Sequence, residues 1–376
     1  MFVSFSSVVG QKGIIEKLRN AILEKKVPHA QLFYGKLGNG GLALAHAYVK
    51  YLFCLNRLDL DSCNQCSNCK RINEFKHPDV HLIFPMVQGL AKTSSPYISE
   101  WRDLTSKNMY FSLSDWIEKI DERGRKPIIS VEESREILQK MTLKSYEGGF
   151  KVVFIWMAET MNMESSNKLL KLIEEPPEKT KFILICENKE QLLPTILSRT
   201  QQVYVPRVED TEIVSHLMEV KKYSEEQANT IVSLLQGDLT QLRDDRLSIE
   251  VNALHLQRFS SMMRVCFKKD VHSMLDWAVE ISSETREKQK QYLEYCLRLC
   301  RESIRSNYLG VEYMHASEQE KIFLEKFSPY ICEKNVLDFM HLFDTSFYHI
   351  DRNVNVEILF TQICFQTMRY IHKAQV

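Results

Sequence analysis

Four of the ten cysteines in this chain of 376 residues lie close together, at a spacing that suits a metal site. Eight residues separate the first two and two residues separate each later pair: Cys54, Cys63, Cys66 and Cys69. Short Cys-x-x-Cys turns bring two sulfurs to one ion, and a tetrahedral zinc site takes four ligands at about 2.3 Å. Disulfides fit such close spacing poorly, which leaves reduced, unliganded thiols as the alternative. We expect a closed, structural zinc site whose shell the cysteines fill without His77 or His81 as substitute ligands.

A second chemical pattern is the glycine-rich stretch 35–42, which follows an apolar run and precedes a helical segment. Strand, glycine loop and helix in this order are the setting of a phosphate-binding P-loop. Gly35 and Gly40 fit the P-loop spacing, but Gly41 replaces its Lys and Leu42 replaces its Ser or Thr. In active P-loops the Lys reaches the outer phosphates and the hydroxyl binds Mg²⁺. We therefore expect the backbone of a nucleotide site without the side chains that hold nucleotide for hydrolysis.

The end of the apolar run 151–156 carries a matching loss. P-loop enzymes place an Asp at the end of such a strand to hold Mg²⁺, and often a Glu beside it that acts on water. Trp156 and Met157 take those places and offer no oxygen ligand to Mg²⁺, while Glu159 comes a few residues late. An unrelated strand–helix unit is the alternative, but two losses on neighbouring strands favour a degenerate ATPase site. We expect no ATP hydrolysis by this chain, and no bound nucleotide cofactor.

Arg199 is a third candidate, and it suggests chemistry outside this chain. It lies between Ser198 and Thr200, at an expected helix end. An Arg between short polar residues can reach the phosphate of a neighbouring protein, and such an arginine finger is worth about 10³–10⁵ in rate. Most surface arginines are simply solvated, so the Ser-Arg pair alone does not decide between these two interpretations.

The elements that would position these groups alternate between strand and helix. The predicted strands are 31–34, 80–84, 151–156, 181–186 and 203–205, and the predicted helices include 42–52, 130–141 and 163–175. This alternation is typical of an α/β layer with a parallel sheet, in which ligands bind beyond the carboxyl ends of the strands. The glycine loop follows such a strand end.

Residues 86–126 differ from this pattern and look like an insertion. Gly, Ser and Thr stand beside four aromatic residues there: Trp101, Tyr110, Phe111 and Trp116. We predict one amphipathic helix at 114–122, preceded by a capping box that starts at Ser112. The aromatic side chains could form a patch for a partner, but packing against the parent domain is the favoured interpretation.

The second half of the chain reads as helical. No strand pattern follows Pro206; residues 211–242 form a small helical unit broken at Gly237, and residues 249–374 show long helices with apolar spacing of three and four. Glycine and proline are sparse in this last part, which suits a helical bundle.

The composition is that of an ordinary globular protein. Hydrophobic residues make up 44% and charged residues 26%, and 49 basic residues balance 49 acidic ones. A dedicated nucleic-acid binder is usually more basic, so DNA contacts should be local or shared with partners. No uncharged apolar run reaches the roughly 18 residues of a membrane helix, and residues 1–10 lack a signal-peptide pattern. We expect a cytoplasmic protein, with no membrane contact, whose other cysteines are free and buried.

Taken together, these motifs resemble the bacterial DNA polymerase III clamp loader, an assembly of the AAA+ family, and most closely its delta prime subunits. The likeness is carried by Val9-Gly10-Gln11, residues 28–33, the glycine loop, the four cysteines with His77-Pro78-Asp79, residues 167–177 and residues 193–199. Residues 351–355 also look like the collar of that family. The string at 167–177, Asn-Lys-Leu-Leu-Lys-Leu-Ile-Glu-Glu-Pro-Pro, is specific in combination, whereas the glycine loop alone is not.

The resemblance implies a subunit of three parts. Residues 1–207 would form an AAA+ P-loop-type α/β domain with a zinc module at 54–69, residues 208–248 a small helical lid, and residues 249–376 an all-α collar for oligomerisation. The delta prime class does not hydrolyse ATP but acts as a rigid stator, which implies that Arg199 is a finger on a neighbour's ATP.

The implied partners are motor subunits of the gamma or tau type and the delta subunit, with the β sliding clamp and primer-template DNA reached through the complex. Lys168 and Lys171 would either face that DNA or carry solvated charge. Thr240, after Gly237, stands near the place of the second sensor arginine of the family. Two departures are Thr200, where the family has Cys, and the insertion, for which we recognise no counterpart.

Two other functions compete with the stator. The first is an active ATPase motor subunit of the same clamp loader, against which the losses at Gly41, Leu42, Trp156 and Met157 argue. The second is a stand-alone, zinc-bearing DNA-binding protein, for which tight duplex binding by the isolated chain would be the sign.

Overall fold

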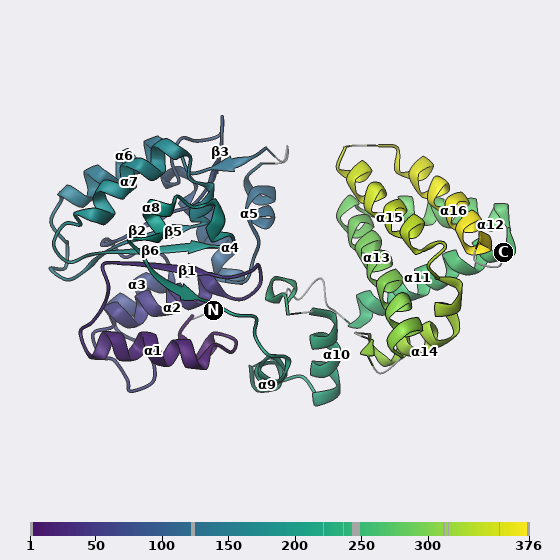
Figure 1. Ribbon diagram of the computed structural model, residues 1–376, viewed down its shortest axis with the longest axis horizontal. Coiled ribbons are helices and arrows are strands. Elements are labelled where there is room, and N and C mark those ends of the chain that lie inside the picture. The colour runs from purple at the N-terminus through teal and green to yellow at the C-terminus, as the bar shows by residue number, and fades with distance from the viewer. Residues whose placement is uncertain are drawn as a thin grey trace. The chain divides into compact units, whose positions relative to one another are not determined.

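The computed structural model of the protein describes residues 3–121, 125–220, 222–235, 237–242, 249–310, 313–314, 316–352 and 354–373. The described chain divides into two compact units, coloured from purple to teal and from green to yellow in Figure 1. The first unit runs to Ala228 and also takes in Gly237–Leu242; the second holds the remainder. The three-part division at 207 and 248 stays a prediction.

Five parallel strands form the main sheet of the first unit, in the order β2-β5-β6-β1-β7 (Figure 1). Their bounds are β1 Ala30–Tyr34, β2 Val80–Ile83, β5 Lys151–Trp156, β6 Thr180–Cys186 and β7 Gln201–Tyr204. Every residue of β5 is buried, as is typical of a parallel strand covered on both faces. The predicted parallel sheet is confirmed, although its last strand begins two residues earlier than expected.

Helices cover both faces of this sheet because side chains alternate along each strand. Phe33 and Phe154 belong to one apolar cluster with α1 and α2, whereas Leu32 and Val153 belong to the opposite cluster with α6 and α7. The helices of this unit are α1 Lys12–Leu23, α2 Gly41–Phe53, α3 Ser67–Asn73, α4 Ile98–Lys107, α5 Leu113–Ile120, α6 Val131–Thr142, α7 Met163–Glu174, α8 Pro194–Leu197 and α9 Asp210–Val220, while α10 Glu225–Leu235 passes into the second unit. The result is a three-layer α/β/α arrangement.

The insertion differs from its prediction. Its described part holds two helices, α4 and α5, where one was expected, and a short antiparallel pair, β3 Met86–Val87 with β4 Pro127–Ile128, closes its base. The expected helix at 114–122 is in fact α5, Leu113–Ile120, which starts one residue earlier and ends two residues earlier. The predicted capping box is confirmed, since Ser112 Oγ accepts from the amide of Asp115 and the Asp115 carboxylate accepts from the amide of Ser112.

The aromatic residues of the insertion pack against the parent unit, which confirms the favoured interpretation. Trp101 and Trp116 are fully buried, and Phe111 is 5% exposed. All three belong to the same apolar cluster as Trp156 at the end of β5. The insertion is therefore part of the core on one side of the sheet and offers no aromatic patch of these residues to a partner.

The second unit is helical in its described residues, as predicted. Its helices are α11 Ile249–Lys268, α12 Val271–Ser282, α13 Arg286–Leu309, α14 Glu318–Phe327, α15 Val336–Asp351 and α16 Val356–Lys373. Cys266, Cys296, Cys300 and Cys364 lie in its core as small apolar side chains, whereas Cys332 is half-buried. Within 351–355, Asn353 lies outside the described residues.

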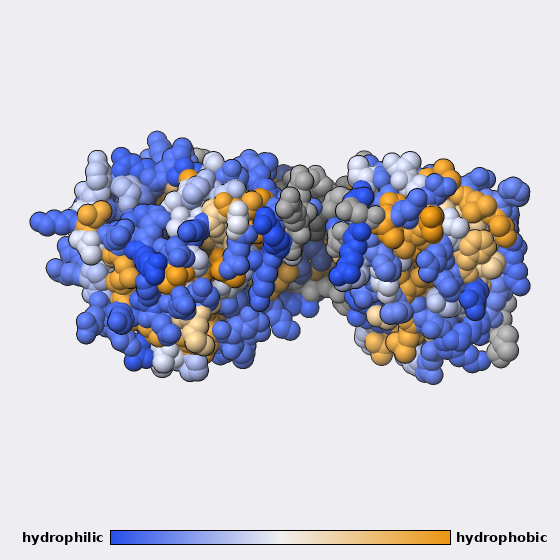
Figure 2. Space-filling model, turned by 90° about the horizontal axis from the view of Figure 1, so that it is seen from above, coloured by the Kyte–Doolittle hydropathy of each residue, from blue (hydrophilic) through white to orange (hydrophobic). Residues whose placement is uncertain are grey.

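Hydrophilic side chains dominate the face of each unit that Figure 2 shows, with apolar side chains in smaller patches. Across the residues that the structure describes, no helix combines the length and the apolar character that a membrane span would need.

Candidate functional site

The glycine loop connects β1, which lies between β6 and β7 in the sheet, to the start of α2. Gly38 and Gly40 have φ values of +81° and +86°, a conformation that favours glycine, and a Cβ on Gly38 would lie 2.1 Å from Asp238 Oδ1. Neighbouring segments fix the loop, because Asn39 Nδ2 donates to Val205 O at 2.9 Å and the amide of Gly35 donates to Cys186 O at 3.3 Å. The predicted strand–loop–helix unit is therefore present.

The loop borders a cavity of about 40 Å³ at the carboxyl ends of β1, β5 and β6. All the residues that sequence reasoning assigned to the nucleotide site line this one cavity: Gly35, Gly40, Gly41, Leu42, Trp156, Met157 and Thr240. The insertion supplies Met109, Tyr110 and Phe111 to the same wall, which the sequence did not predict. Small-molecule sites usually measure about 300–1,000 Å³, so the cavity as it stands is too small for a nucleotide.

The chemistry of the wall does not suit a magnesium nucleotide. Leu42, Trp156 and Met157 are each at most 5% exposed and offer neither a cation nor an oxygen ligand. Glu187 also lines the cavity, and burial, with the negative charge of Glu159 and then Asp238, raises its pKa to about 7. Glu187 therefore adds an acidic group to a wall that also contains Lys36.

Glu159 serves a structural purpose at the end of β6. Its Oε1 accepts from the amide of Glu187 at 2.7 Å and from the amide of Asn188 at 3.2 Å. Burial raises the pKa of this carboxyl, and the two amides oppose that rise. Glu159 therefore holds the turn after β6.

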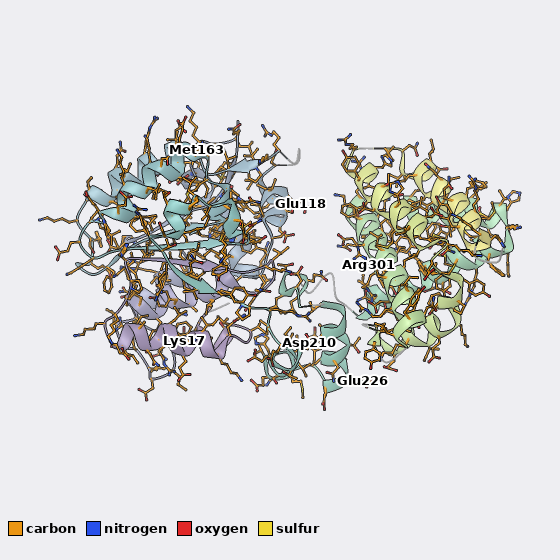
Figure 3. All side chains as sticks on the ribbon, in the orientation of Figure 1. Lys17, Glu118, Met163, Asp210, Glu226 and Arg301 are labelled. Atoms are coloured by element: carbon orange, nitrogen blue, oxygen red, sulfur yellow. The ribbon has the colours of Figure 1, made fainter. Side chains whose placement is uncertain are left out.

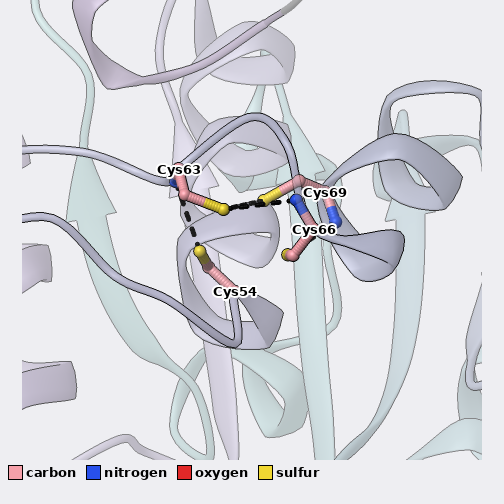
Figure 4. A group of neighbouring side chains, drawn as sticks. All are labelled: Cys54, Cys63, Cys66 and Cys69. Carbon is pink, nitrogen blue, oxygen red and sulfur yellow. Dashed lines mark hydrogen bonds between the residues drawn. The ribbon is translucent and has the colours of Figure 1, made fainter.

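The four predicted zinc ligands come together between α2 and α3 (Figure 4). Their Sγ atoms all lie within 4.8 Å of one another, and Cys63 and Cys69 are separated by 4.0 Å. Four ligands at about 2.3 Å in a tetrahedron place sulfurs about 3.8 Å apart, so small movements suffice to bind one ion. Backbone amides also point at the sulfurs: the amide of Cys63 donates to Cys54 Sγ at 3.3 Å, and that of Cys66 to Cys63 Sγ at 3.4 Å.

A buried lysine supports an anionic centre at this place. Lys50 is fully buried on α2, and its Nζ donates to Val3 O at 2.8 Å. Burial lowers the pKa of Lys50, while the thiolates of the cysteine cluster, with Asp61, raise it. A zinc ion with four thiolates carries a net charge of about −2, which a buried ammonium offsets. The residues therefore fit a structural zinc ion, which stays a prediction.

The two nearby histidines have other roles. The buried His77 accepts from the amide of Asp79 through Nδ1 at 3.2 Å, and its Nε2 lies 3.4 Å from Glu147 Oε2. His81 lies on β2, and burial lowers its pKa to about 4. Neither belongs to the group of sulfurs that could hold a metal.

Arg199 lies in the turn between α8 and β7, with its side chain 39% exposed. Its Nε lies 2.8 Å from Glu174 Oε1 at the end of α7, and its Nη1 donates to Thr195 O at 3.2 Å. The neighbouring Thr200 is buried, and its hydroxyl donates to Ile196 O at 3.0 Å, so this side chain stabilises the turn. The guanidinium is held in place and still open to solvent.

The helix that leads to Glu174 carries the most specific string of the sequence. α7 begins at Met163, which is 69% exposed and is labelled on the first unit in Figure 3. Leu169, Leu172 and Ile173 anchor it in the core, whereas Lys171 is exposed and Lys168 is half-buried.

Comparison with known proteins places the chain in a family. A family model described as "DNA polymerase III, delta subunit" matches residues 10–209. The DNA polymerase III subunit tau/gamma of Haemophilus influenzae is 32% identical over 217 residues, which make up 58% of this chain and 26% of that protein. The DNA polymerase III subunit delta' of Bacillus subtilis is 31% identical over 209 residues, or 56% of this chain and 51% of that protein. This chain thus spans about a quarter to about a half of the length of these relatives.

Among solved structures, a DNA polymerase III gamma subunit-related protein from Thermotoga maritima aligns over 94% of this chain and 99% of its own, with 15% identity and a TM-score of 0.39. That likeness is too distant to bear on function. The family model, by contrast, covers more than half of the 376 residues. The protein therefore belongs to the DNA polymerase III, delta subunit family of clamp-loader proteins.

Proposed function

We propose that this protein is a delta prime-type stator of the replicative clamp loader, which does not hydrolyse ATP and lends Arg199 to the ATP site of a neighbouring motor subunit. Its relatives include delta', tau and gamma subunits, so the likeness alone does not separate stator from motor. The observation that favours the stator is the cavity at the glycine loop, where Leu42, Trp156 and Met157 stand in place of phosphate and Mg²⁺ ligands.

The position of Arg199 supports the second half of the proposal. An arginine finger must be exposed, so that it can enter a neighbour's site, and held, so that little entropy is lost when it does. The side chain of Arg199 is partly exposed to solvent, and it also contacts Glu174 and Thr195. A contact between two exposed side chains is worth at most about 1 kcal/mol, so a phosphate can displace Glu174 at low cost.

The partners follow from the same proposal. The motor subunits of the gamma or tau type and the delta subunit would bind this chain directly, through a collar at 249–376 among other surfaces. The β sliding clamp and primer-template DNA would be reached through the complex, with Lys171 exposed toward solvent as a candidate DNA contact. Zinc would have a structural role.

The wild-type chain, purified alone, should show no magnesium-dependent ATP turnover in a coupled ATPase assay. Gly41→Lys should not create it, although a side chain fits there, because a Cβ on Gly41 would meet only Ile185 Cγ2, at 3.6 Å. The lysine would still lack a hydroxyl at Leu42 and an acid at Trp156, so Mg²⁺ would have no ligands. Lys also favours a helix over Gly by roughly 0.5–1 kcal/mol, so the variant should fold. Robust turnover by the wild type would instead assign the motor function.

A further inference from the structure

Three residues of the insertion fill the place next to the glycine loop, and we call them the aromatic plug: Met109, Tyr110 and Phe111. They connect α4 to α5 and line the cavity together with the loop and the ends of β5 and β6. Tyr110 comes closest, because a Cβ on Gly40 would lie only 2.9 Å from its ring. Gly40 is the residue immediately before α2, where the amides of a P-loop face phosphate.

The plug is bonded to the first segment of the chain as well as to the loop. The Tyr110 hydroxyl accepts from the amide of Val9 at 2.9 Å, and burial raises the pKa of this phenol to about 12. Asn108 fixes the backbone of the same residue, since its Nδ2 donates to Tyr110 O at 2.9 Å and its Oδ1 accepts from the amide of Tyr110 at 2.9 Å. The phenol therefore makes a directed contact and does more than occupy free volume.

A cluster of aromatic rings packs against the aromatic plug. Trp101 stacks on Phe84 with centroids 4.6 Å apart, and it also lies 5.0 Å from Trp156. Phe111 lies 5.1 Å from Trp156 and 5.5 Å from Trp101. Such offset and edge-on pairs are worth about 0.5–1.5 kcal/mol each beyond their buried area. Trp156, at the end of β5, is thus directly part of the packing of the insertion.

A second anchor ties the insertion to the opposite side of the sheet. The buried Glu133 of α6 accepts from the amide of Ser94 at 2.5 Å and from its hydroxyl at 2.8 Å. Trp116 Nε1 donates to Pro85 O at 2.8 Å at the base of the insertion. These contacts lie on both sides of the plug along the chain, so its position is set by the fold of the insertion as a whole.

We propose that the aromatic plug is a built-in occupant of the glycine-loop site, which takes the place of an adenine nucleotide and keeps the loop in its P-loop shape without a ligand. This inference rests on the proposed non-hydrolysing function and deepens it: the missing side chains abolish chemistry, and the plug abolishes nucleotide binding. A glycine loop without its ligand has many amides to satisfy and readily loosens. An internal aromatic segment removes that freedom and makes the domain rigid at all nucleotide concentrations.

The test is a calorimetric titration of the zinc-loaded chain of 376 residues with ADP. The wild type should show no saturation, whereas the double variant Tyr110→Ala/Phe111→Ala should bind ADP at least about tenfold more tightly, still without turnover of ATP. The titration is best done at pH 6, below the pKa of about 7 that burial and neighbouring acids give Glu187. Tyr146→Ala, which removes a 79% exposed tyrosine of the same unit, is the matched control and should behave as wild type.

The outcomes separate this inference from the proposed function. ADP binding by the wild type as tight as by the double variant would overturn the plug but leave the stator intact, and so would a folded double variant that does not bind ADP. ATP turnover by the wild type would overturn the proposed function itself.

A second measurement covers the case in which the double variant fails to fold. Tyr110→Phe keeps the ring and removes only the hydroxyl, so it should still exclude ADP while the amide of Val9 exchanges its hydrogen at least about tenfold faster. An unchanged exchange rate at Val9 would show that the phenol does not hold this segment, and would overturn the plug as a directed occupant.

Discussion

Arg199→Ala should lower ATP hydrolysis by about 10³-fold or more at the one neighbouring site that Arg199 serves, while the complex still assembles. The effect is large because the guanidinium would neutralise charge that develops only in the transition state. The measurement is the burst of ATP hydrolysed in the first turnover by the clamp loader, reconstituted on primed DNA with saturating amounts of this subunit. The burst should fall by the amount that one ATP site contributes. The isolated variant should unfold within about 0.5 kcal/mol of the wild type, since Arg199 is a surface residue.

Two matched variants serve as controls for this prediction. Arg135→Ala removes another exposed arginine of the same unit, which lies 3.6 Å from Glu132, and should leave the burst unchanged. Glu174→Gln breaks the ion pair of Arg199 but keeps its guanidinium, so it should change the burst far less than Arg199→Ala. If Glu174→Gln were as damaging as Arg199→Ala, the ion pair and not the finger would be the important feature. An undiminished burst in Arg199→Ala would remove the assigned role.

The parallel sheet could be predicted from the sequence because its signals are local. The strand at 151–156 is a run of apolar, mostly β-branched and aromatic residues, and the structure places β5 at these same six residues. A helix was predicted at 130–141, and in the structure it begins after Ser130, whose Oγ accepts from the amide of Glu133. Caps and apolar runs involve residues a few positions apart, so the sequence displays them directly.

The insertion could be predicted only in part because its structure depends on distant partners. α4, Ile98–Lys107, was missed: it has ten residues, and only Trp101 and Thr105 are buried, so its apolar pattern is too sparse to recognise. Its stability comes from contacts of Trp101 with Phe84 and Trp156, which lie far away in the chain. The plug itself carries no sequence signal at all, because nothing near Tyr110 in the sequence indicates that Gly40 and Val9 are its neighbours.

The candidate site could also be predicted only in part from the sequence. Comparison with a motif predicted missing side chains at Gly41, Leu42, Trp156 and Met157, and the structure gathers these positions around one cavity. What fills the cavity could not be recognised, because sequence motifs describe what an active site needs and not what replaces it. Trp156 illustrates both points, since it was interpreted as a lost acid from the sequence and packs against Phe111 in the structure.

Removal of zinc should have the largest effect on stability. Metal analysis should find about one zinc ion per chain, as four thiolates require, and Cys69→Ser should lower that content to a small fraction. Loss of the ion removes the four metal bonds that join the end of α2 to α3, together with negative charge near the buried Lys50, and we expect a cost of about 3–5 kcal/mol. For a domain of this size that corresponds to a fall in Tm of very roughly 10 °C, measured by circular dichroism. Cys332→Ser, in the second unit, should change neither zinc content nor Tm; a metal-free wild type with an unchanged Tm would exclude a zinc site.

Substitution of Lys50 tests where that stabilisation comes from, because its effect on stability should differ between the zinc-bound and the zinc-free protein. With zinc bound, Lys50→Met would leave a centre of net charge about −2 without the ammonium that offsets it, so zinc affinity should fall by at least about tenfold in a competition titration with a chromophoric chelator. In the Cys69→Ser background, which lacks zinc, the same substitution replaces a costly buried charge by an apolar side chain and should leave Tm unchanged or raise it. Opposite signs in the two backgrounds would show that the lysine and the ion stabilise each other across α2, the helix that begins at the glycine loop. A Lys50→Met variant equally harmful in both backgrounds would instead assign the effect of Lys50 to contacts that do not involve the ion, such as its hydrogen bond with Val3 O.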